Sequence, residues 1–561
     1  RSAAAACWFG RLAQRDSGFA LGRPVFQYGA GAHAFAAYLD PDYGSVFTLD
    51  GRALVMGNRF HTARTLVGYA PLLARPVCGR AAVVGPEAGF YLPFLARGGV
   101  TNIAVCRADR KFVNLAVAAD AYVTRCDAST NAAVVWRPRL PAGSGYDAII
   151  VAPAPAWQLG AQRLYGPRAL RRYARALSSD GVLALHLDAR ALSEARLASV
   201  ARDFASVFPG VQLWCAGAYD WVLVGCARPV KAPLDALLAL FERDPVFRDF
   251  TRAGGLALQD ALACVVCDGR GLGDWLKSAG AERAWESVWR APLDAVGVGR
   301  GAVQPAALER ARQWKAGWIL PGQTDADVYV AFTDKVGRAI GARARAAEAL
   351  AETAKGRGDA ALEAARDAAA ISPHDALLVQ FAEVVELEGR RRIKIGDMAG
   401  ALKCYENLLS FSTGTAQAHY GMGYCLRGKG DSENAYLHFA RAVADAPEQA
   451  AYRLELAQAA LTIGEYAEAD RQYREVLKRE PGNAEALFRY AKGLALKDRP
   501  DKDYGQAIAL AERACKLTAW KNSEYAFGLA DLYMDAGRVM EGLGLKRRLK
   551  EGGTITSPTA P

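Results

Sequence analysis

Two adjacent stretches of this 561-residue chain, 416–449 and 450–483, repeat one another over 34 positions. Matching positions carry two small residues, a large aromatic ring and a closing proline: Gly423 and Ala457, Ala435 and Ala469, Phe439 and Tyr473, Pro447 and Pro481. Small residues let two helices approach closely, and proline ends a helix because it lacks the N–H and clashes with the preceding turn. A repeat of this length therefore predicts helical hairpins that stack into a solenoid.

Weaker copies of the pattern flank this pair. They cover 346–373, 375–414, 484–518 and 523–550, and the last copy is expected to close the array. The pattern resembles the tetratricopeptide repeat family over 343–550, with an unrelated helical bundle as the alternative.

The resemblance implies a concave face, formed by the first helix of each hairpin, that binds an extended peptide or another subunit. The implied partner-binding residues are His419, Tyr420, Tyr424, Arg453 and Gln458. His419 and His438 are expected to be unpaired surface or packing residues rather than metal ligands.

Upstream of the repeats, residues 79–226 alternate between strand and helix patterns. Strands are predicted at 80–84, 102–106, 131–136, 146–151 and 181–187, followed by a hairpin of 211–215 and 220–225. Helices are predicted at 167–177 and 193–208. Such alternation is typical of a doubly wound α/β sheet, here a Rossmann-like domain of the methyltransferase type.

Several short motifs resemble the spermidine synthase (aminopropyltransferase) superfamily over residues 25–226. They occur in the family's order: Val46–Gly51, Pro71–Leu73, Val83–Gly85, Tyr146–Val151, Leu164–Tyr165 and Leu177–Val182. The resemblance implies a small N-terminal β domain and a glycine-rich loop that approaches a nucleoside closely. Gly85 and Gly89 keep that loop's glycines and are the implied cofactor-binding residues.

The acidic residues of that family are missing from the corresponding positions. Cys106 and Arg107 stand where an acid would bind the ribose, and Asp109 comes a few residues late. The family's proton-accepting aspartate is replaced by Ala152, so no catalytic residue is assigned. Basic residues occupy further positions of this implied site: Arg137, Arg139 and Arg168. Like charges repel the cationic substrates of that family, by several kcal/mol when juxtaposed.

We therefore expect a non-catalytic, pseudoenzyme domain with no cofactor. The alternative is an active polyamine aminopropyltransferase, or another transferase that uses S-adenosylmethionine or its decarboxylated form. Its acidic site would be rearranged around Glu87, Asp109, Asp127 and Asp147. Asp147 is more simply a structural residue at the start of its strand.

The predicted domain organisation follows from these motifs. It comprises an N-terminal β segment (1–78), the spermidine-synthase-like domain (79–228), a helical connecting region (229–342), the repeat array (343–550) and a flexible tail (551–561). In the connecting region, Gly269–Gly273 is expected to be a glycine loop. Cys264 and Cys267 are expected to end an apolar helix, and no second Cys/His pair at zinc spacing follows them.

The composition and charge of the chain limit the classes of partner that we expect. The net charge is +11 and the pI near 9.1, but no nucleic-acid-binding motif accompanies the basic clusters, which favours solvated helix faces. No apolar run reaches the ~18 residues of a membrane span. We expect a protein partner and no specific nucleic acid, with peripheral membrane association open. Eleven cysteines without a disulfide-like spacing favour a reducing compartment, on the cytoplasmic side.

Overall fold

The computed structural model describes 26–28, 35–40, 44–49, 52–56, 58–85, 88–107, 132–152, 162–188, 194–217, 220–243, 257–278, 318–412, 415–447 and 449–550. The chain forms two compact units, Arg1–Glu383 and Val384–Pro561. We describe each unit by itself.

The first unit begins with a four-stranded antiparallel sheet. Its strands are β1 (Phe26–Tyr28), β2 (Phe35–Asp40), β3 (Gly44–Leu49) and β4 (Arg52–Met56), paired in chain order. Helix α2 (Asn58–Ala74) follows and packs on the larger sheet. A small N-terminal β region was predicted from the resemblance, and the structure contains one.

The larger sheet has eight strands in the order β13-β10-β11-β9-β8-β5-β6-β7. Its parallel part consists of β5 (Arg80–Val84), β6 (Asn102–Cys106), β7 (Ala133–Arg137), β8 (Tyr146–Val151) and β9 (Leu177–Asp188). The predicted hairpin is β10 (Gly210–Cys215) and β11 (Asp220–Cys226). β5 and β8 are neighbours although β6 and β7 separate them in sequence, so the strand order reverses between them. Ligands of open α/β sheets bind at such a switch point, beyond the carboxyl ends of the strands.

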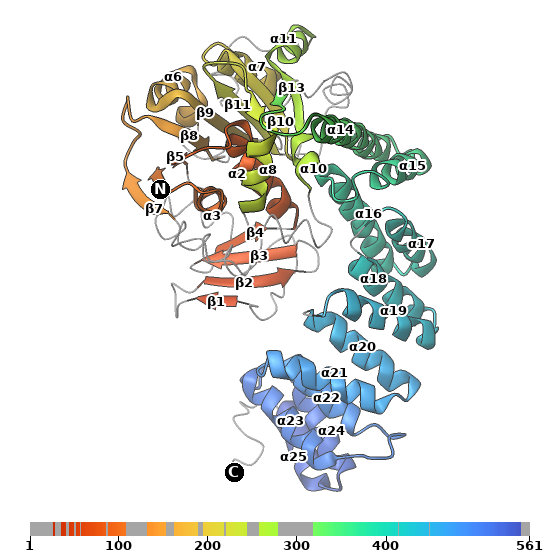
Figure 1. The fold of residues 1–561 in the computed structure, drawn as a ribbon. Helices are drawn as coiled ribbons and strands as arrows, with labels where there is room; N and C mark the ends of the chain where they lie inside the picture. Colours follow the sequence, from red (N-terminus) through yellow and green to blue (C-terminus); the bar gives the residue numbers. More distant parts are fainter. Residues whose placement is uncertain are drawn as a thin grey trace. The chain divides into compact units, whose positions relative to one another are not determined.

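Helices cover both faces of this sheet (Figure 1). Besides α2, the helices α6 (Pro167–Ala176), α7 (Glu194–Ala205) and α11 (Gly269–Ser278) contact its strands. This part of the chain also contains α3 (Leu92–Arg97), α5 (Gln162–Tyr165), α8 (Leu234–Arg243) and α10 (Leu258–Leu262). A short parallel pair joins β12 (Ala232–Pro233) to β14 (Ile319–Leu320).

Two expectations for the connecting region were wrong. Val265–Asp268 forms strand β13, which pairs with β10 at the sheet edge, so the two cysteines do not end a helix. Gly269–Gly273 forms the first turns of α11 instead of a loop. The β-branched Val265 and Val266 favour a strand, and the exposed edge of β10 supplies its hydrogen bonds.

The first unit also contains the first helices of the array. These are α14 (Ala326–Ala354), α15 (Gly358–Ala369) and the start of α16 (Ala376–Lys394), and the predicted array boundary at Arg343 lies inside α14. Arg343 is buried, pairs with Asp375 at 2.6 Å and donates a second hydrogen bond to the Cys215 carbonyl at the end of β10. Ser372 donates to the buried Asp260 of α10 at 2.7 Å. Buried polar bonds therefore fix the first hairpin to the α/β sheet.

The second unit is a run of helical hairpins stacked one after another (Figure 1). Its helices after α16 are α17 (Met398–Leu409), α18 (Thr415–Gly428), α19 (Ser432–Asp445), α20 (Ala450–Ile463), α21 (Tyr466–Arg479), α22 (Ala484–Leu494), α23 (Tyr504–Leu517), α24 (Ser523–Asp535) and α25 (Val539–Lys550). The hairpins predicted from the two matching repeats are confirmed as α18–α19 and α20–α21. Among the described helices, none combines the length and the apolarity that crossing a bilayer requires.

The small and large repeat positions pack as predicted. A Cβ atom at Gly423 would lie 2.7 Å from the Phe439 ring, so only glycine permits this approach of α18 to α19. Phe439 and Tyr473 are fully buried between successive hairpins.

Candidate functional site

The carboxyl ends of β5 and β8 meet at Gly85 and Ala152. The Gly85 N–H donates to the Cys106 carbonyl (3.0 Å), and the Ala152 N–H donates to the Val84 carbonyl (2.8 Å). Gly85 has φ +123°, which side chains rarely adopt, and a Cβ there would lie 3.0 Å from the Ala152 oxygen. Ala152 itself has no exposed surface. The two strand ends are therefore in direct contact at the switch point.

Among the described residues, a tyrosine at the end of α5 contacts Ala152. The buried Tyr165 hydroxyl donates to the Ala152 carbonyl at 3.3 Å. Gly89 is buried in a short 3-10 turn, Ala88–Phe90. The predicted Asp109, and Glu87 and Asp127 of the alternative reading, lie outside the described residues.

Asp147 lies at the opposite, amino end of the strands. Its carboxylate accepts hydrogen bonds from the Gly79 and Arg80 N–H groups at 3.0 and 3.1 Å and pairs with Arg75 at 2.9 Å. These bonds tie the start of β5 to β8. Asp147 is thus a structural residue and cannot contribute to an acidic site at the carboxyl edge.

Among the described residues, arginines stand at the carboxyl ends of β6 and β7. Arg107 follows the strand with φ +56°, a left-handed conformation that costs energy for a residue with a side chain. Burial raises the pKa of the Cys106 thiol to about 11, although the charges of Arg137, Arg172 and Arg107 act in the opposite direction. Arg168, on α6, is exposed. Among the described residues of this edge, Arg107 and Arg137 carry positive charge.

A buried polar chain near this edge was missed from the sequence. The Tyr91 hydroxyl lies 2.7 Å from His186 Nδ1, and His186 Nε2 lies 2.9 Å from the Asp220 carboxylate. His186 is on β9 and almost fully buried, and Asp220 begins β11. A histidine inside an otherwise apolar strand was the only signal for this chain, because its partners come from distant segments. Within the described part of the molecule, no group of three or more His, Cys, Asp or Glu side chains could hold a metal ion.

The second candidate site lies on the first helices of three successive hairpins, α18, α20 and α22. We call the surface formed by Tyr420, Tyr424, Arg427, Gln458 and Arg489 the A-helix face. The Tyr420 ring lies 5.2 Å from Tyr424 and 4.6 Å from Tyr452 of α20, centroid to centroid. Burial raises the pKa of Tyr420.

Charged side chains continue the A-helix face from one hairpin to the next. The buried Glu455 of α20 accepts hydrogen bonds from Arg427 of α18 and, at 2.9 Å, from Arg489 of α22. Arg427 also lies 4.3 Å above the Tyr424 ring. One carboxylate thus fixes two arginines, whose side chains are 33% and 31% exposed, and Arg489 also pairs with Glu485 of its own helix at 2.7 Å.

Two other predicted partner-binding residues, Arg453 and His419, have partners within the array. Arg453 donates to the Pro447 carbonyl at 2.8 Å and to Gln472 at 2.6 Å, so it joins two hairpins. The expectation that His419 and His438 are unpaired was wrong, because their Nδ1 atoms lie 3.0 Å apart. Burial lowers the pKa of both imidazoles. Gln458 is half-buried on α20, and its backbone carbonyl accepts a hydrogen bond from the Thr462 hydroxyl.

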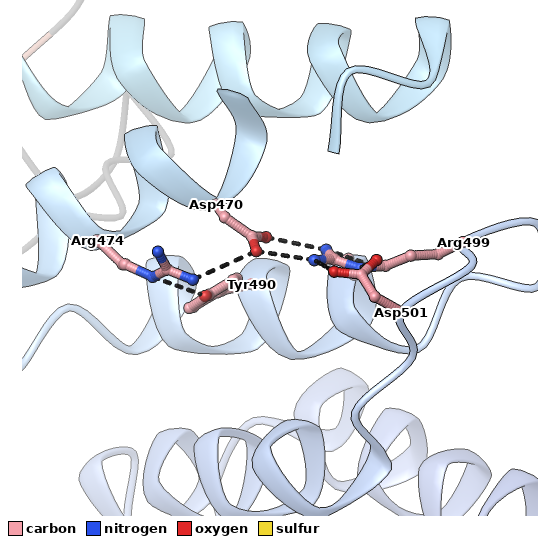
Figure 2. A network of polar contacts seen from close by, with 6 residues as sticks. Asp470, Arg474, Tyr490, Arg499 and Asp501 are labelled. Atoms are coloured by element: carbon pink, nitrogen blue, oxygen red, sulfur yellow. Dashed lines mark hydrogen bonds and ion pairs between the residues drawn. The ribbon is translucent and has the colours of Figure 1, made fainter. Parts of the chain in front are cut away.

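The loop 495–503 joins α22 to α23, and we call it the insertion. A polar network holds it against the array (Figure 2). Arg499 lies between Asp470 of α21 and Asp501 of its own loop, at 2.7 and 2.9 Å. Arg474 reaches Asp470 from the other side at 3.4 Å and donates to the Tyr490 hydroxyl at 3.2 Å. The buried guanidinium shows that this insertion is a packed part of the array.

The chain shows only low similarity to known proteins. No protein-family profile matches the chain. No curated protein sequence matches it either. Solved structures that resemble part of the chain include a spermidine synthase in complex with the transition state analogue AdoDATO, a spermidine synthase from Thermotoga maritima, and MamA from Desulfovibrio magneticus RS-1.

The first has 14% identity and a TM-score of 0.34, and the match covers 46% of this chain and 89% of that one. The second has 15% identity and a TM-score of 0.29, with 37% and 74% covered. MamA has 17% identity and a TM-score of 0.27, with 30% and 93% covered. Neighbours of the chain thus include both a spermidine synthase and MamA, at low similarity.

Proposed function

We propose that this protein is a non-catalytic interaction subunit, in which a degenerate spermidine-synthase-like domain carries a tetratricopeptide-type array that binds a protein partner. The observation that carries the proposal is the A-helix face. It presents two clustered tyrosines and two arginines held in place by Glu455. Aromatic and arginine side chains dominate the binding energy of protein interfaces, particularly where they are pre-organised.

The carboxyl edge of the α/β sheet supports the non-catalytic half of the proposal. Aminopropyl transfer needs a base for the attacking amine, and the position that resembles the family's proton acceptor is the buried Ala152. Arg107 and Arg137 bring positive charge to the same edge, which disfavours cationic substrates.

Peptide selection tests the interaction half. The full-length protein serves as bait for a displayed peptide library, and selected peptides are remade and measured by fluorescence anisotropy. We expect Tyr424→Ala and Gln458→Arg to weaken binding at least ~10-fold, or about 1.4 kcal/mol. The matched control is Leu437→Ala, an exposed apolar residue on α19. Circular dichroism checks that each variant is folded. Selected peptides whose affinity ignores both A-helix substitutions would contradict the proposal.

Titration calorimetry tests the non-catalytic half independently. We expect no binding of S-adenosylmethionine or its decarboxylated form at millimolar concentration. Micromolar affinity for either compound would favour the alternative, an active transferase with a rearranged site.

A further inference from the structure

Two histidines join the two helices of the α18–α19 hairpin. The Nδ1 atom of His419 on α18 lies 3.0 Å from the Nδ1 atom of His438 on α19, and the ring centroids are 5.2 Å apart. A hydrogen bond at this distance needs a proton on one nitrogen and a free lone pair on the other. Both residues are half-buried. We call this hydrogen bond the histidine contact.

The next hairpin has a different bond at the same place. The residues 34 positions further on are Arg453 of α20 and Gln472 of α21, and Arg453 donates to the Gln472 side-chain oxygen at 2.6 Å. Arginine stays protonated in proteins and glutamine does not titrate, so this bond keeps its donor and its acceptor at any physiological pH. The histidine contact is therefore the titratable form of an interhelical bond that the following hairpin makes permanently.

The number of protons on the pair decides whether the histidine contact survives. When both imidazoles are neutral, one Nδ1–H group donates to the other Nδ1 atom. A first extra proton leaves this bond in place, because a charged ring can still donate to a neutral one. A second extra proton puts an N–H group on both Nδ1 atoms, so that two donors and two positive charges face each other. The histidine contact is therefore lost only in the doubly protonated state, and the two rings titrate as a coupled pair.

The charged groups that act on the pair belong to α19. Burial lowers the pKa of His419, the carboxylate of Asp445 raises it, and the guanidinium of Arg441 lowers it. Burial lowers the pKa of His438 as well, and the charge of His419 lowers it further. The helices α17 and α20 pack on this hairpin, and among their described residues no charged side chain shifts the pKa of either imidazole.

The sign of the pH dependence follows from these lowered pKa values. The unfolded chain takes up both protons near the ordinary pKa of 6.5, whereas the folded hairpin takes them up at lower pH. The contribution of the pair to stability is therefore full above pH 6.5 and is lost as pH falls through the lowered pKa values.

We propose that the histidine contact is a pH-sensitive switch that loosens the α18–α19 hairpin in acid. The part that loosens comprises the first turns of α18 and the last turns of α19, where the Thr415 hydroxyl also donates to Asp445 at 2.5 Å. The packing of the Phe439 ring on Gly423 involves no titratable group and should hold the rest of the hairpin together. Because Tyr420 follows His419 directly, the A-helix face changes at one end. The switch lies in the hairpin itself and does not depend on whether that face binds a peptide.

Hydrogen–deuterium exchange of the full-length protein tests the proposal. Exchange is measured at about pH 7.5 and about pH 5, on either side of the ordinary histidine range, and each rate is corrected for the intrinsic pH dependence of amide exchange. We expect the protection of 415–421 and 438–445 to fall at least ~10-fold in acid. The equivalent segments of the next hairpin, 450–455 and 472–479, serve as the internal control and should change less than ~2-fold.

Substitutions assign the acid response to the pair. In His438→Gln, the side-chain oxygen of the new glutamine can accept from His419 whether or not that ring is charged, so the protection of 415–421 should become independent of pH. The double variant His419→Arg/His438→Gln copies the bond of the next hairpin and should behave in the same way. His374→Gln is the matched control, because it removes another half-buried imidazole from the chain and should leave the acid response of 415–421 intact. Circular dichroism at about pH 7.5 checks that each variant is folded.

Three outcomes would overturn the proposal. Unchanged protection of 415–421 in acid would show that the hairpin tolerates both protons. An equal loss of protection in both hairpins would show general acid unfolding instead of a local switch. The same acid response in the wild type and in folded His438→Gln or His419→Arg/His438→Gln would place the responsible group elsewhere.

Discussion

The guanidinium of Arg499 donates one hydrogen bond to each carboxylate oxygen of Asp470, at 2.9 and 2.7 Å. Asp470 belongs to α21, whereas Arg499 lies in the insertion between α22 and α23 (Figure 2). Both residues are buried, and Arg499 also pairs with Asp501. A bidentate buried pair has the geometry in which guanidinium and carboxylate match best.

Removing Arg499 should open the insertion. In Arg499→Met, Asp470 would remain buried with its strongest partner gone, which costs about 3–5 kcal/mol. Hydrogen–deuterium exchange of peptides covering 494–503 should accelerate about a hundredfold or more. Arg474→Met is the control, because this arginine is 65% exposed and its pair with Asp470 is longer. Its effect should stay below about 1 kcal/mol. Equal effects of the two variants would contradict this account.

The buried pair of Arg343 and Asp375 should be cooperative. Arg343→Met leaves a buried carboxylate and an unpaired Cys215 carbonyl, and should lower the free energy of unfolding by about 3–5 kcal/mol. The double variant Arg343→Met/Asp375→Asn removes the buried negative charge of Asp375. The side-chain oxygen of the new asparagine can still accept from the Leu377 N–H, so part of the lost stability should return. Denaturation of these two variants and of the single variant Asp375→Asn, followed by tryptophan fluorescence, measures this coupling. Additive losses would show that the two residues act separately.

Asp260 should make the first unit less stable as pH rises. Burial raises its pKa above 3.8, the charge of Asp375 adds to this, and the hydrogen bond from Ser372 opposes it. An acid with a raised native pKa binds its proton more tightly in the folded state. Its contribution to stability is therefore full below pH 3.8 and is lost as pH rises through the raised pKa. Thermal midpoints measured against pH should fall more steeply in the wild type than in Asp260→Asn. If the thermal midpoints of the two proteins fell in parallel with pH, Asp260 would not be the source of the pH dependence.

The buried thiols should resist alkylation. Burial raises the pKa of Cys215 to about 11 and that of Cys264 to about 12. Because the thiolate is the nucleophile, these cysteines should be nearly inert to iodoacetamide at pH 8. Cys404 is the least buried described cysteine and should react first. Mass spectrometry of peptides from folded and denatured protein gives both rates. Fast labelling of Cys264 in the folded protein would contradict the burial argument.

Restoring an acid at position 152 should not create a site. Ala152→Asp would place a carboxylate in fully buried surroundings against Gly85, which costs several kcal/mol. The thermal midpoint should fall, and calorimetry should still detect no S-adenosylmethionine binding. Ala133→Asp, at an exposed position of β7, is the matched control. A stable Ala152→Asp protein that binds the nucleoside would show that the site needs only its acid.

Local sequence patterns predicted the helices and strands well where neighbours in the chain decide the structure. The hairpins at α18–α21 follow from small residues, aromatic rings and prolines at a fixed period. The strands from β5 to β11 follow from short apolar runs between turns. Strand β13 was missed because it forms only against the edge of β10, far away in sequence.

The candidate sites were less predictable for the same reason. Tyr420 and Tyr424 were expected together because they lie four residues apart on one helix. The pairing of Arg427 and Arg489 with Glu455 depends on how three hairpins stack. His186 acquires Tyr91 and Asp220 only through the folded sheet, and no local pattern encodes either partner.

The bonds of Arg343 and Ser372 also bear on how the chain can be divided for experiments. A fragment beginning at residue 343 would start in the middle of α14. It would expose the guanidinium of Arg343, which is buried in the full chain. The complementary fragment, 1–342, would keep Asp260 and lose the hydroxyl that satisfies it. Neither piece should be soluble and homogeneous on its own. An autonomous N-terminal fragment would have to retain the chain through Asp375, although the repeat pattern already begins well before that residue.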